Sequence, residues 1–486
     1  MLLHEILTFA ATHAPADLAL VVAGERRTFA ELDDRVARLA GALAANAAPG
    51  DRVAVVADNC SAWVECYYGV PRAGLLLVPI NQRLTPGEQA DLLAAAEPTV
   101  LIGERARLDA LAPLAAAFPS VQTVAAVDEP GWDAMVTTSP PLEPVPDQRD
   151  DDPAWLLFTS GTTGTPKGAV LSHRALVTAV VGAGFGRPIA PDDVFATAFP
   201  LCHVAGFNVM VAHLHGRPAV VLGPFRADEF AEAVAADAVT TTSLAPTMLL
   251  ALLDHLDATA TELPSLRMVG YGAAPIPPAV LRRAEARLGV TFSESFGMTE
   301  LAGAAAYEGR PTPLVSFRIV GPDMTDASPG EVGEIVVRGD QVTTGYWRDP
   351  VATAEAFTGG WFHTGDLGRW DDGLLRVVDR SKDVIITGGE NVMSREVEDV
   401  LHDHPGVAAA AVVGVPDDYW GEAICAVVVP QPGAELTPAE LVAHVGERLA
   451  GFKRPKHVVF VEALPVNASG KIRKAELRRL AADHLG

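Results

Sequence analysis

The chain contains the stretch Phe158-Thr-Ser-Gly-Thr-Thr-Gly-Thr-Pro-Lys-Gly168, which is dense in glycine and in hydroxyl side chains. Glycines allow backbone N–H groups to approach an anion closely, and the hydroxyls can donate hydrogen bonds to phosphate oxygens. Lys167 adds a positive charge near the end of the stretch. We therefore predict a loop that holds a polyphosphate, with a surface turn that binds nothing as the alternative.

Two apolar runs flank this loop, Trp155-Leu-Leu-Phe158 before it and Gly168-Ala-Val-Leu171 after it. Both predict buried strands, and Ser172 is expected to cap a helix that follows. A Walker P-loop opens directly into a helix after its lysine, whereas Lys167 is followed by glycine and strand-like residues. This context disfavours a kinase or a GTPase.

Composition limits the classes of protein to which the chain can belong. Its 486 residues predict at least two domains, and 61 acidic against 37 basic residues disfavour nucleic acid and anionic membranes as partners. The four cysteines lack C-x-x-C spacing, so neither a zinc site nor a disulfide framework is expected. The amino terminus does not resemble a signal peptide, and no apolar run approaches the ~18 residues of a membrane span. We therefore expect a cytoplasmic protein without a transmembrane segment.

Helix and strand patterns alternate along most of the chain. Thr28-Phe-Ala-Glu31 is a capping box that predicts an amphipathic helix over about residues 29–45, and Arg52-Val-Ala-Val-Val-Ala57 predicts the next strand. The alternation continues to Val127 and resumes from about residue 190 to residue 300. Such a pattern predicts an α/β fold of parallel sheets covered by helices.

The pattern changes in the last third of the chain. Short strands such as Leu374-Leu-Arg-Val-Val378 predict a small antiparallel unit or barrel. After Asp379-Arg-Ser-Lys-Asp383 a compact α/β unit of about 100 residues begins. Within it Ser394 is expected to cap a helix, and Thr437-Pro-Ala-Glu440 forms another capping box. Strands are expected over residues 407–413 and 423–429.

Several motifs occur together: Thr159-Ser-Gly-Thr-Thr-Gly-Thr-Pro-Lys-Gly168, Glu294-Ser-Phe-Gly-Met-Thr-Glu300, Gly360-Trp-Phe-His-Thr-Gly-Asp366, Asp379-Arg-Ser-Lys-Asp383 and Asn467-Ala-Ser-Gly-Lys471. In this order they resemble the adenylate-forming (AMP-binding) superfamily, and within it the branch of acyl-CoA synthetases and fatty-acid–CoA ligases. The resemblance implies a large N-terminal domain of αβ-layered parallel sheets with a small β-barrel-like unit, followed by a small mobile α+β lid. It places the domains at residues 1–380 and 383–486, with a hinge at 381–382.

The resemblance also implies a reaction in two halves. A carboxylate attacks the α-phosphate of ATP to give acyl-AMP and pyrophosphate, and the thiol of CoA then displaces AMP to give acyl-CoA. The expected cofactors are ATP, Mg²⁺ and CoA, and the other partner is a small carboxylic acid. Whether the protein is a monomer or a homodimer stays open.

Site residues follow from the same resemblance. It gives the adenylation step to Lys471, and it gives Thr299 and Glu300 the contacts to phosphate and magnesium, with Glu300 as the metal ligand. The implied phosphate-binding residues are Thr159, Ser160, Gly161, Thr162, Thr163, Gly164 and Lys167. The implied adenine- and ribose-binding residues are Gly272, Ala273, Ala274, Ser295, Phe296, Gly297, Asp366 and Arg380. The implied acyl pocket contains His203, Phe207, Gly270 and Met298, while Lys382 is the hinge, and Gly388 and Gly389 line the CoA tunnel.

Each of these residues also has an ordinary structural explanation. His203 fits a satisfied core histidine as well as a pocket residue, and Arg380 fits a surface ion pair. The chain departs from the family pattern in two places, because Phe296 stands where most members have tyrosine and the segment 301–308 is short. These departures put the acyl specificity in doubt and bear on the efficiency of one half-reaction.

The residues around His203 and Gly270 suggest which acid is bound. No aspartate near His203 could pair the amine of an amino acid, and no arginine lies in Val269-Gly-Tyr-Gly-Ala-Ala274 to bind a second carboxylate. We therefore expect an apolar monocarboxylic acid, which is fatty, alicyclic or aromatic. The alternatives are an enzyme that loads a carrier protein instead of CoA, and a variant competent in one half-reaction or a silent adenylate-binding protein.

Overall fold

The structure is a computed structural model of the chain and describes residues 1–143, 145, 147–159, 166–272, 276, 278–466 and 472–485. It divides into two compact units, each of which is described by itself. Unit 1 consists of Met1–Ala273, Val290–Ser316 and Arg338–Phe362, and unit 2 consists of Ala274–Gly289, Phe317–Val337 and His363–Gly486. The hinge at residues 381–382 and the domains on either side of it stay a prediction.

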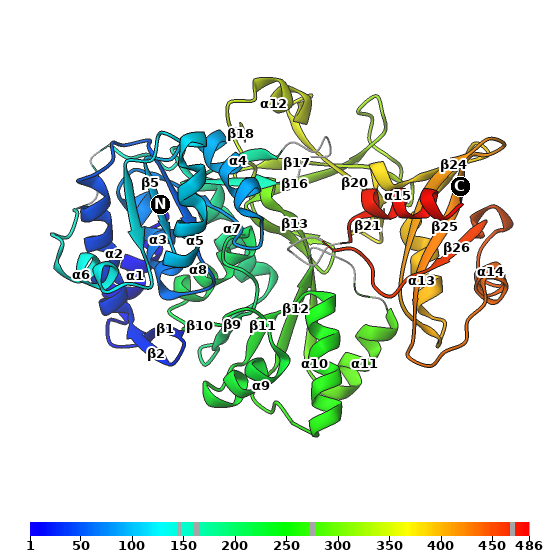
Figure 1. Cartoon of the computed structure of the whole chain (residues 1–486), viewed down its shortest axis with the longest axis horizontal. Coiled ribbons are helices and arrows are strands. Elements are labelled where there is room, and N and C mark those ends of the chain that lie inside the picture. Colours follow the sequence, from blue (N-terminus) through cyan, green and yellow to red (C-terminus); the bar gives the residue numbers. More distant parts are fainter. Residues whose placement is uncertain are drawn as a thin grey trace. The chain divides into compact units, whose positions relative to one another are not determined.

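The strands that flank the predicted phosphate loop belong to a seven-stranded sheet of unit 1 (Figure 1). Five of its strands are parallel, and β8 and β18 pair antiparallel at one edge. The order across the sheet is β18 (Gly345–Tyr346), β8 (Lys167–Ser172), β7 (Pro153–Thr159), β4 (Leu76–Pro79), β3 (Arg52–Val56), β5 (Val100–Gly103) and β6 (Thr123–Ala126). The predicted strands on both sides of the loop are confirmed.

A nine-stranded sheet forms the other half of unit 1. Its six central strands are parallel, and antiparallel strands close both edges. The order is β15 (Arg310–Pro311), β14 (Gly303–Tyr307), β13 (Thr291–Met298), β12 (Met268–Gly272), β11 (Thr241–Ser243), β9 (Phe195–Thr197), β10 (Ala219–Val221), β1 (Leu18–Val22) and β2 (Glu25–Thr28). The predicted α/β fold with parallel sheets is therefore confirmed.

Helices cover both sheets of unit 1. One apolar cluster joins strands of both sheets to α1 (Glu5–His13), α2 (Phe29–Ala44), α3 (Ser61–Arg72), α6 (Pro130–Thr138), α7 (His173–Gly186) and α8 (Phe207–Leu214). A second cluster covers the opposite face of the seven-stranded sheet with α4 (Pro86–Ala96), α5 (Arg105–Leu111) and η1 (Ala112–Ala117). The other helices are α9 (Ala227–Ala236) and α10 (Pro246–Thr259) in unit 1 and α11 (Pro278–Leu288) in unit 2.

Local capping signals set the helix starts that the sequence predicts. The Thr28 side chain accepts a hydrogen bond from the backbone N–H of Glu31, and the Glu31 side chain accepts one from the backbone N–H of Thr28. The helix α2 begins at Phe29, directly after Thr28. Ser172 accepts from the backbone N–H of Ala175 and caps α7. Such capping bonds satisfy N–H groups that have no partner within the helix. These predictions are confirmed because they depend only on neighbouring residues.

The short strands form a third, five-stranded sheet. It has the order β16 (Val315–Val320), β17 (Gly333–Gly339), β20 (Trp361–Asp371) and β19 (Phe357–Thr358), and β21 (Leu374–Arg380) pairs with β20. Both β19 and β21 run antiparallel to β20. The helix α12 (Pro350–Ala356) precedes β19.

The C-terminal part of unit 2 is a sheet with helices on both faces. Its strands follow the order β23 (Glu390–Val392), β22 (Ile385–Thr387), β25 (Gly421–Pro430) and β24 (Val407–Asp417), and β26 (His457–Phe460) pairs with β25. Alternate residues of the long β24–β25 pair face α13 (Ser394–His402) and α14 (Pro438–Gly446) on one side and α15 (Lys474–Leu485) on the other (Figure 1). The predicted strands and the capping box at Thr437 are confirmed.

The prediction that Ser394 caps a helix is wrong. Ser394 is the first residue of α13, and Met393, which makes no side-chain cap hydrogen bond, stands at the cap position. The Ser394 hydroxyl instead donates to Asp379 Oδ2 at 2.8 Å and accepts from Lys474 Nζ at 2.6 Å. The buried carboxylate of Asp379, which comes earlier in the chain, thus accepts the hydrogen bond of the Ser394 hydroxyl. The local sequence pattern instead predicts that this hydroxyl binds a backbone N–H group of the helix.

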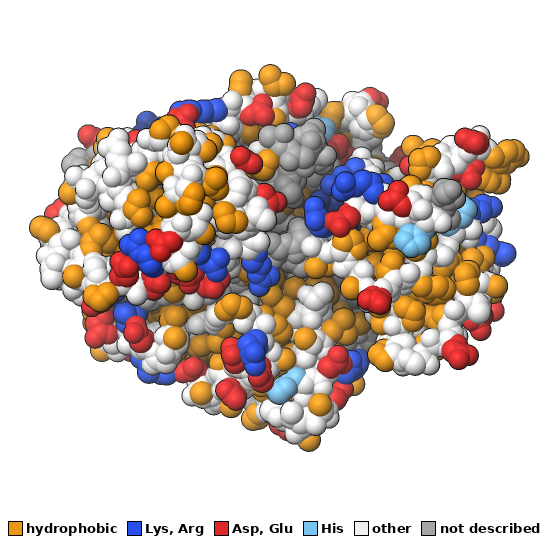
Figure 2. Space-filling model, in the orientation of Figure 1, with side chains coloured by type: hydrophobic (Ala, Val, Ile, Leu, Met, Phe, Trp, Pro, Cys, Tyr) orange, Lys and Arg blue, Asp and Glu red, His pale blue; other side chains and the backbone are white. Residues whose placement is uncertain are grey.

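The surface carries charges of both signs. On the face shown in Figure 2, acidic side chains (red) are spread among basic ones (blue). None of the helices in the described ranges combines the length and the apolar character that crossing a membrane requires.

Candidate functional site

The predicted phosphate loop connects the two strands of a hairpin. Thr159 ends β7 and faces Lys167 at the start of β8. Ser160, Gly161, Thr162, Thr163 and Gly164 lie outside the described residues. Gly168 is a strand residue, and a Cβ there would lie 2.8 Å from the Leu156 side chain and 3.3 Å from Trp347. Its lack of a side chain thus has a packing reason.

Glu300 lies at the base of this loop. Its carboxylate Oε1 accepts a hydrogen bond from Tyr346 Oη at 3.1 Å and a longer one from Thr159 Oγ1 at 3.5 Å. Lys167 Nζ lies 5.2 Å from the centroid of the Tyr346 ring. Burial, followed by the charge of Glu300, raises the pKa of Tyr346, so its phenol stays protonated and donates. The sequence predicts Thr159, Lys167 and Glu300 for one site, but it does not predict Tyr346.

The main chain also holds Glu300 in place. The Thr343 backbone N–H donates to the carbonyl oxygen of Glu300 at 2.7 Å. Thr343 is itself buried, and its hydroxyl donates to the carbonyl oxygen of Val170 on β8. The strand that ends the phosphate loop is therefore tied to the segment that carries the acidic side chain.

The donor set around Glu300 limits the kind of metal that can bind. Among the described residues no group of three or more His, Cys, Asp or Glu side chains is placed to hold an ion. Magnesium bound to a nucleotide takes one or two carboxylates together with phosphate oxygens. The single carboxylate of Glu300 therefore fits a magnesium ion that arrives with a nucleotide, and the described residues do not form an all-protein metal cage.

The predicted adenine-binding residues lie on two neighbouring strands. Gly272 of β12 pairs with Ser295 of β13, and a Cβ on Gly272 would lie 2.5 Å from the Ser295 hydroxyl oxygen. The Ser295 hydroxyl donates to the carbonyl oxygen of Tyr271 at 3.1 Å. Gly272 therefore has a packing reason to be glycine at the end of its strand. Ala273 and Ala274 lie outside the described residues.

The motif that contains Phe296 continues along β13 into the short segment after it. Phe296 pairs with Ala306, and the register shifts between Phe296 and Gly297. At Gly297 a Cβ would lie 2.1 Å from the Gly303 carbonyl oxygen, so the two strands approach there as closely as their backbones allow. The segment 301–308 is the end of η3 (Thr299–Leu301) and the strand β14, so its shortness reflects a tight hairpin.

Two of the predicted acyl-pocket residues, Phe207 and Met298, are both neighbours of Gly303 in this hairpin. Phe207 begins α8, and its ring lies against Gly303, where a Cβ would be 3.1 Å from a ring carbon. Gly303 pairs directly with Met298 across β13 and β14. His203 precedes η2 (Val204–Gly206), the short turn that leads into α8.

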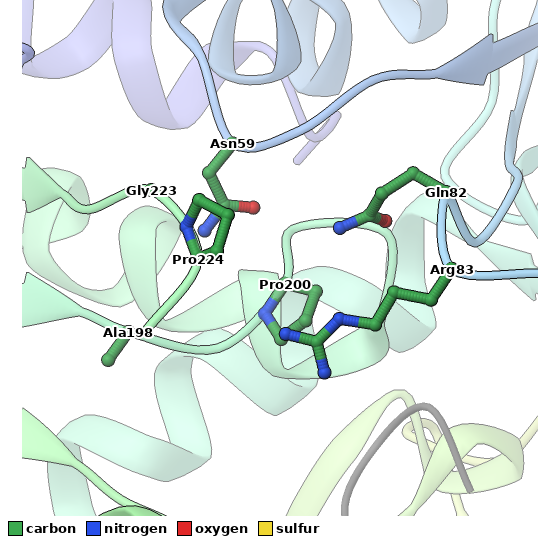
Figure 3. A pocket seen from close by; sticks show the side chains of 7 residues that line it. All are labelled: Asn59, Gln82, Arg83, Ala198, Pro200, Gly223 and Pro224. Carbon is green, nitrogen blue, oxygen red and sulfur yellow. The ribbon is translucent and has the colours of Figure 1, made fainter. Parts of the chain in front are cut away.

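A small cavity lies close to His203 in the chain and was not predicted from the sequence (Figure 3). Its lining comes from loops that follow the carboxyl ends of β3, β4, β9 and β10, an edge where ligands of open α/β sheets commonly bind. The lining residues are Asn59, Gln82, Arg83, Ala198, Pro200, Gly223 and Pro224. The cavity volume is about 10 Å³, which is room for about one water molecule. Its size excludes an organic acid.

Asn59 explains why these loops lie together. Its side-chain amide donates to the carbonyl oxygens of Phe199 at 2.9 Å and Leu222 at 2.8 Å, and its oxygen accepts from the Leu201 N–H at 2.7 Å. These bonds fix the chain just before His203.

In unit 2 the two predicted ribose-binding residues form an ion pair. Asp366 on β20 and Arg380 on β21 are cross-strand partners, and Arg380 Nε lies 3.1 Å from Asp366 Oδ1. Asp366 is buried, whereas about half of the Arg380 side chain is exposed. The structure thus brings the two residues together, and their contact with ribose stays a prediction.

The remaining predicted residues of unit 2 occupy turns. Lys382 lies in η4 (Ser381–Asp383), and burial, followed by the charge of Arg380, lowers its pKa. Gly388 and Gly389 form the two-residue turn between β22 and β23, with φ of 59° and 86°. Positive φ at both positions is the requirement of a type I′ hairpin turn, which favours glycine. Lys471 lies outside the described residues.

Comparisons with known proteins cover nearly the whole chain. Residues 7–347 match the family model described as AMP-binding enzyme, and residues 396–471 match that of the AMP-binding enzyme C-terminal domain. Feruloyl-CoA synthase of Amycolatopsis sp is 40% identical over 96% of both chains. Indoleacetate–CoA ligase of Aromatoleum aromaticum is 37% identical over 94% of this chain and 93% of its own. The crystal structure of ATP-bound MatB from Rhodopseudomonas palustris is similar over 100% of both chains, with a TM-score of 0.91 and 31% identity.

Proposed function

Since the chain belongs to the AMP-binding enzyme family, we propose that it is an ATP-dependent acyl-CoA ligase that activates a carboxylic acid as its adenylate and transfers it to CoA. The observation that carries this proposal is the cluster of Thr159, Lys167 and Glu300 at the base of the loop between β7 and β8. Near full-length similarity to two CoA ligases supports it.

The first half-reaction joins the acid to AMP. A carboxylate oxygen attacks the α-phosphorus of ATP, the bond to the β-phosphate oxygen breaks, and pyrophosphate leaves. Lys167 and the hydroxyls of the loop bind the β- and γ-phosphates, and Lys471 offsets the negative charge that develops around the α-phosphorus. Glu300 would hold a magnesium ion on the phosphates, and such an ion would supply charge neutralisation for the leaving pyrophosphate.

The second half-reaction releases the acid as a thioester. The CoA sulfur attacks the acyl carbon, the thiol proton is lost, and AMP leaves with the electron pair of the broken carbon–oxygen bond. Gly388 and Gly389 leave room for the pantetheine arm because neither has a side chain. Lys382 serves as the hinge between the two steps.

The acid is an aromatic or other apolar monocarboxylic acid. The two relatives reported above are named for ferulate and indoleacetate, which are both aromatic acids. The residues that we assign to the acyl pocket, Phe207, Met298 and Gly270, present apolar or small surfaces.

The decisive experiment separates the two half-reactions. Purified protein with ATP and magnesium is tested for acid-dependent ATP–pyrophosphate exchange over a panel of aromatic, alicyclic and fatty acids. AMP release and thioester formation are then measured with CoA and with a phosphopantetheinylated carrier protein. We expect exchange with at least one aromatic acid and thioester formation with CoA. Thioester formation only with the carrier protein would overturn the CoA assignment.

A matched lysine pair tests the catalytic assignment. Lys471→Ala should lower the exchange rate by about 100-fold or more, because removing a preorganised cation at a transition state costs that much. Lys456→Ala, a change at an exposed lysine of the same unit, should leave exchange unchanged. Exchange that is equally fast in both variants, or absent with every acid, would overturn the proposal.

A further inference from the structure

One buried cation of unit 1 has no place in the reaction described above. Arg187 follows α7, and only 5% of its surface is exposed. Its guanidinium donates to the Ser243 hydroxyl oxygen at 3.1 Å and to Asn208 Oδ1 at 3.3 Å, and it lies 4.9 Å from the centroid of the Phe195 ring. All three neighbours are uncharged.

The charge of this guanidinium is not neutralised within the described part of the chain. None of the carboxylates described there lies within ion-pair distance of Arg187. The nearby Asp193 is already bonded to Arg267 and to the hydroxyl of Thr240. Burial lowers the pKa of Arg187, and Tyr307 and Asp193 only partly oppose that effect. A buried charge without a partner costs stability, so its presence calls for an explanation.

Arg187 lies over a row of small residues on one face of the nine-stranded sheet. Thr197, Ser243, Gly270 and Ser293 are aligned across β9, β11, β12 and β13, so their Cβ positions point to the same side. A Cβ on Gly270 would lie 2.5 Å from the Arg187 Nη1 atom. Gly270 therefore provides the space into which the guanidinium extends.

This position connects Arg187 to the acyl pocket. Gly270 is one of the residues that we assign to that pocket, and Asn208, which accepts from Arg187, directly follows another of them, Phe207. Among the described residues, Ser243 and Asn208 take two of the five guanidinium N–H groups, so the described part of the chain leaves three for another acceptor.

We propose that Arg187 is the polar end of the acyl-binding pocket and selects carboxylic acids whose far end carries a hydrogen-bond-accepting oxygen. The inference rests on the proposed function and deepens it, because it names a substrate class. A guanidinium can only donate, so the group that it recognises must accept. The hydroxyls of Ser243 and Ser293 in the same row suit a phenol or alcohol oxygen, which both accepts and donates. Arg187 lies outside the segments around His203 and Gly270 from which the sequence predicts an apolar acid.

The test compares acids that differ only at the far end: cinnamic acid and its 4-hydroxy, 4-methoxy and 4-carboxy derivatives. For the wild type we expect kcat/KM to be about 10- to 100-fold higher for the 4-hydroxy acid than for cinnamic acid, the range of one hydrogen bond to a charged group. Given that preference, the 4-methoxy and 4-carboxy acids show whether a neutral acceptor without a donor, or an anionic acceptor, is also bound.

Variants assign the preference to Arg187. Arg187→Met should bring the ratio of kcat/KM for the 4-hydroxy acid and cinnamic acid close to one, mainly by raising KM for the 4-hydroxy acid. Arg187→Lys should keep part of the preference, because it retains a donor. Arg226→Met, which changes an exposed arginine of the same unit, is the matched control and should keep the wild-type ratio. A ratio of one in the wild type, or the same ratio in Arg187→Met, would overturn the proposal.

A binding measurement separates this inference from the proposed function. The shift in Tm that each acid produces without ATP reports binding whether or not turnover occurs. A larger shift with the 4-hydroxy acid than with cinnamic acid, reduced in Arg187→Lys and lost in Arg187→Met, supports the subsite even if no acid forms a thioester. Equal shifts in the wild type contradict it, even if cinnamic acid is converted efficiently. Should Arg187→Met fail to fold, the wild-type ratio and Arg187→Lys decide.

Discussion

Tyr346 Oη donates a hydrogen bond to Glu300 Oε1 at 3.1 Å. Because the same phenol ring lies 5.2 Å from Lys167 Nζ, Tyr346 contacts both the acidic and the basic side chain of the predicted phosphate site. Glu300 Oε1 is thus held by the protein, and the carboxylate can present its other oxygen to a magnesium–nucleotide complex. We infer that Tyr346 positions Glu300.

Tyr346→Phe removes this hydrogen bond and keeps the ring. We expect the ATP–pyrophosphate exchange rate to fall about 10-fold, because a hydrogen bond to a charged group contributes about 1.5–3 kcal/mol, and only part of it acts on the transition state. The magnesium concentration at half-maximal rate should rise, which a purely structural role for Tyr346 does not predict. Tyr419→Phe, at an exposed tyrosine, is the matched control. Unchanged magnesium dependence in Tyr346→Phe would contradict the positioning role.

Asp366 offers a test of ribose binding that does not depend on the overall rate. If its carboxylate accepts hydrogen bonds from both ribose hydroxyls, 2′-deoxy-ATP should be a poorer substrate than ATP by about 10-fold or more, since a site built for a hydroxyl leaves its own polar groups unpaired without it. Asp366→Ala should bring the ratio of kcat/KM for the two nucleotides towards one. Asp371→Ala, on the same strand, should keep the wild-type ratio. An unchanged ratio in Asp366→Ala would remove this residue from the ribose site.

The features that the sequence predicts correctly depend on short stretches of chain. The capping boxes at Thr28 and Thr437 need only residues three positions apart, and the strands on both sides of the phosphate loop are continuous apolar runs. Motifs also predict which residues share a site when each lies at the end of such an element. Thr159 and Glu300 meet because β7 and β13 both end there.

The features that the sequence does not predict come from contacts between distant segments. Nothing near Ser394 in the chain indicates that Asp379 takes its hydroxyl, so the local capping pattern gives the wrong result. Tyr346 and Arg187 carry no motif, and only the fold places them beside Glu300 and Gly270. Gly168, in the same way, looks like part of an anion-binding loop but is enclosed by Leu156 and Trp347.

Gly388 and Gly389 differ in how closely other residues surround them, so substitutions at the two positions can distinguish a structural role from a role in CoA binding. A Cβ on Gly388 would lie 2.7 Å from the Trp420 ring, whereas nothing lies within 4 Å of one on Gly389. Both have positive φ, which costs a non-glycine residue about 1 kcal/mol. Gly388→Ala should therefore lower the free energy of unfolding by about 2 kcal/mol or more, and Gly389→Ala by about 1 kcal/mol.

The functional effect of Gly389→Ala is the informative one. Because the variant should stay folded, we expect ATP–pyrophosphate exchange at the wild-type rate together with slower thioester formation from CoA, if the turn lines the pantetheine tunnel. Gly433→Ala also places a methyl group at a glycine with positive φ and open space, and it serves as the control. Equal thioester rates in the two variants would leave the glycines with only their role in the turn.

Buried histidines should make the stability of unit 1 depend on pH. Burial lowers the pKa of His4, His173 and His213 to about 4 in each case, and for His4 the charge of Arg72 adds to this effect. Between about pH 6.5 and pH 4 the unfolded chain therefore binds protons that the folded chain does not, so the free energy of unfolding falls as pH falls. Each such histidine contributes a slope of about 1.4 kcal/mol per pH unit within that window.

Both ring nitrogens of His4 lack a hydrogen-bond partner among the described residues, so His4→Leu should reduce the slope. Urea unfolding of His4→Leu and of His13→Leu, an exposed position on the helix α1 that directly follows His4, at several pH values checks this. A slope equal to that of the wild type in His4→Leu would show that His4 titrates in the folded protein as it does in the unfolded chain.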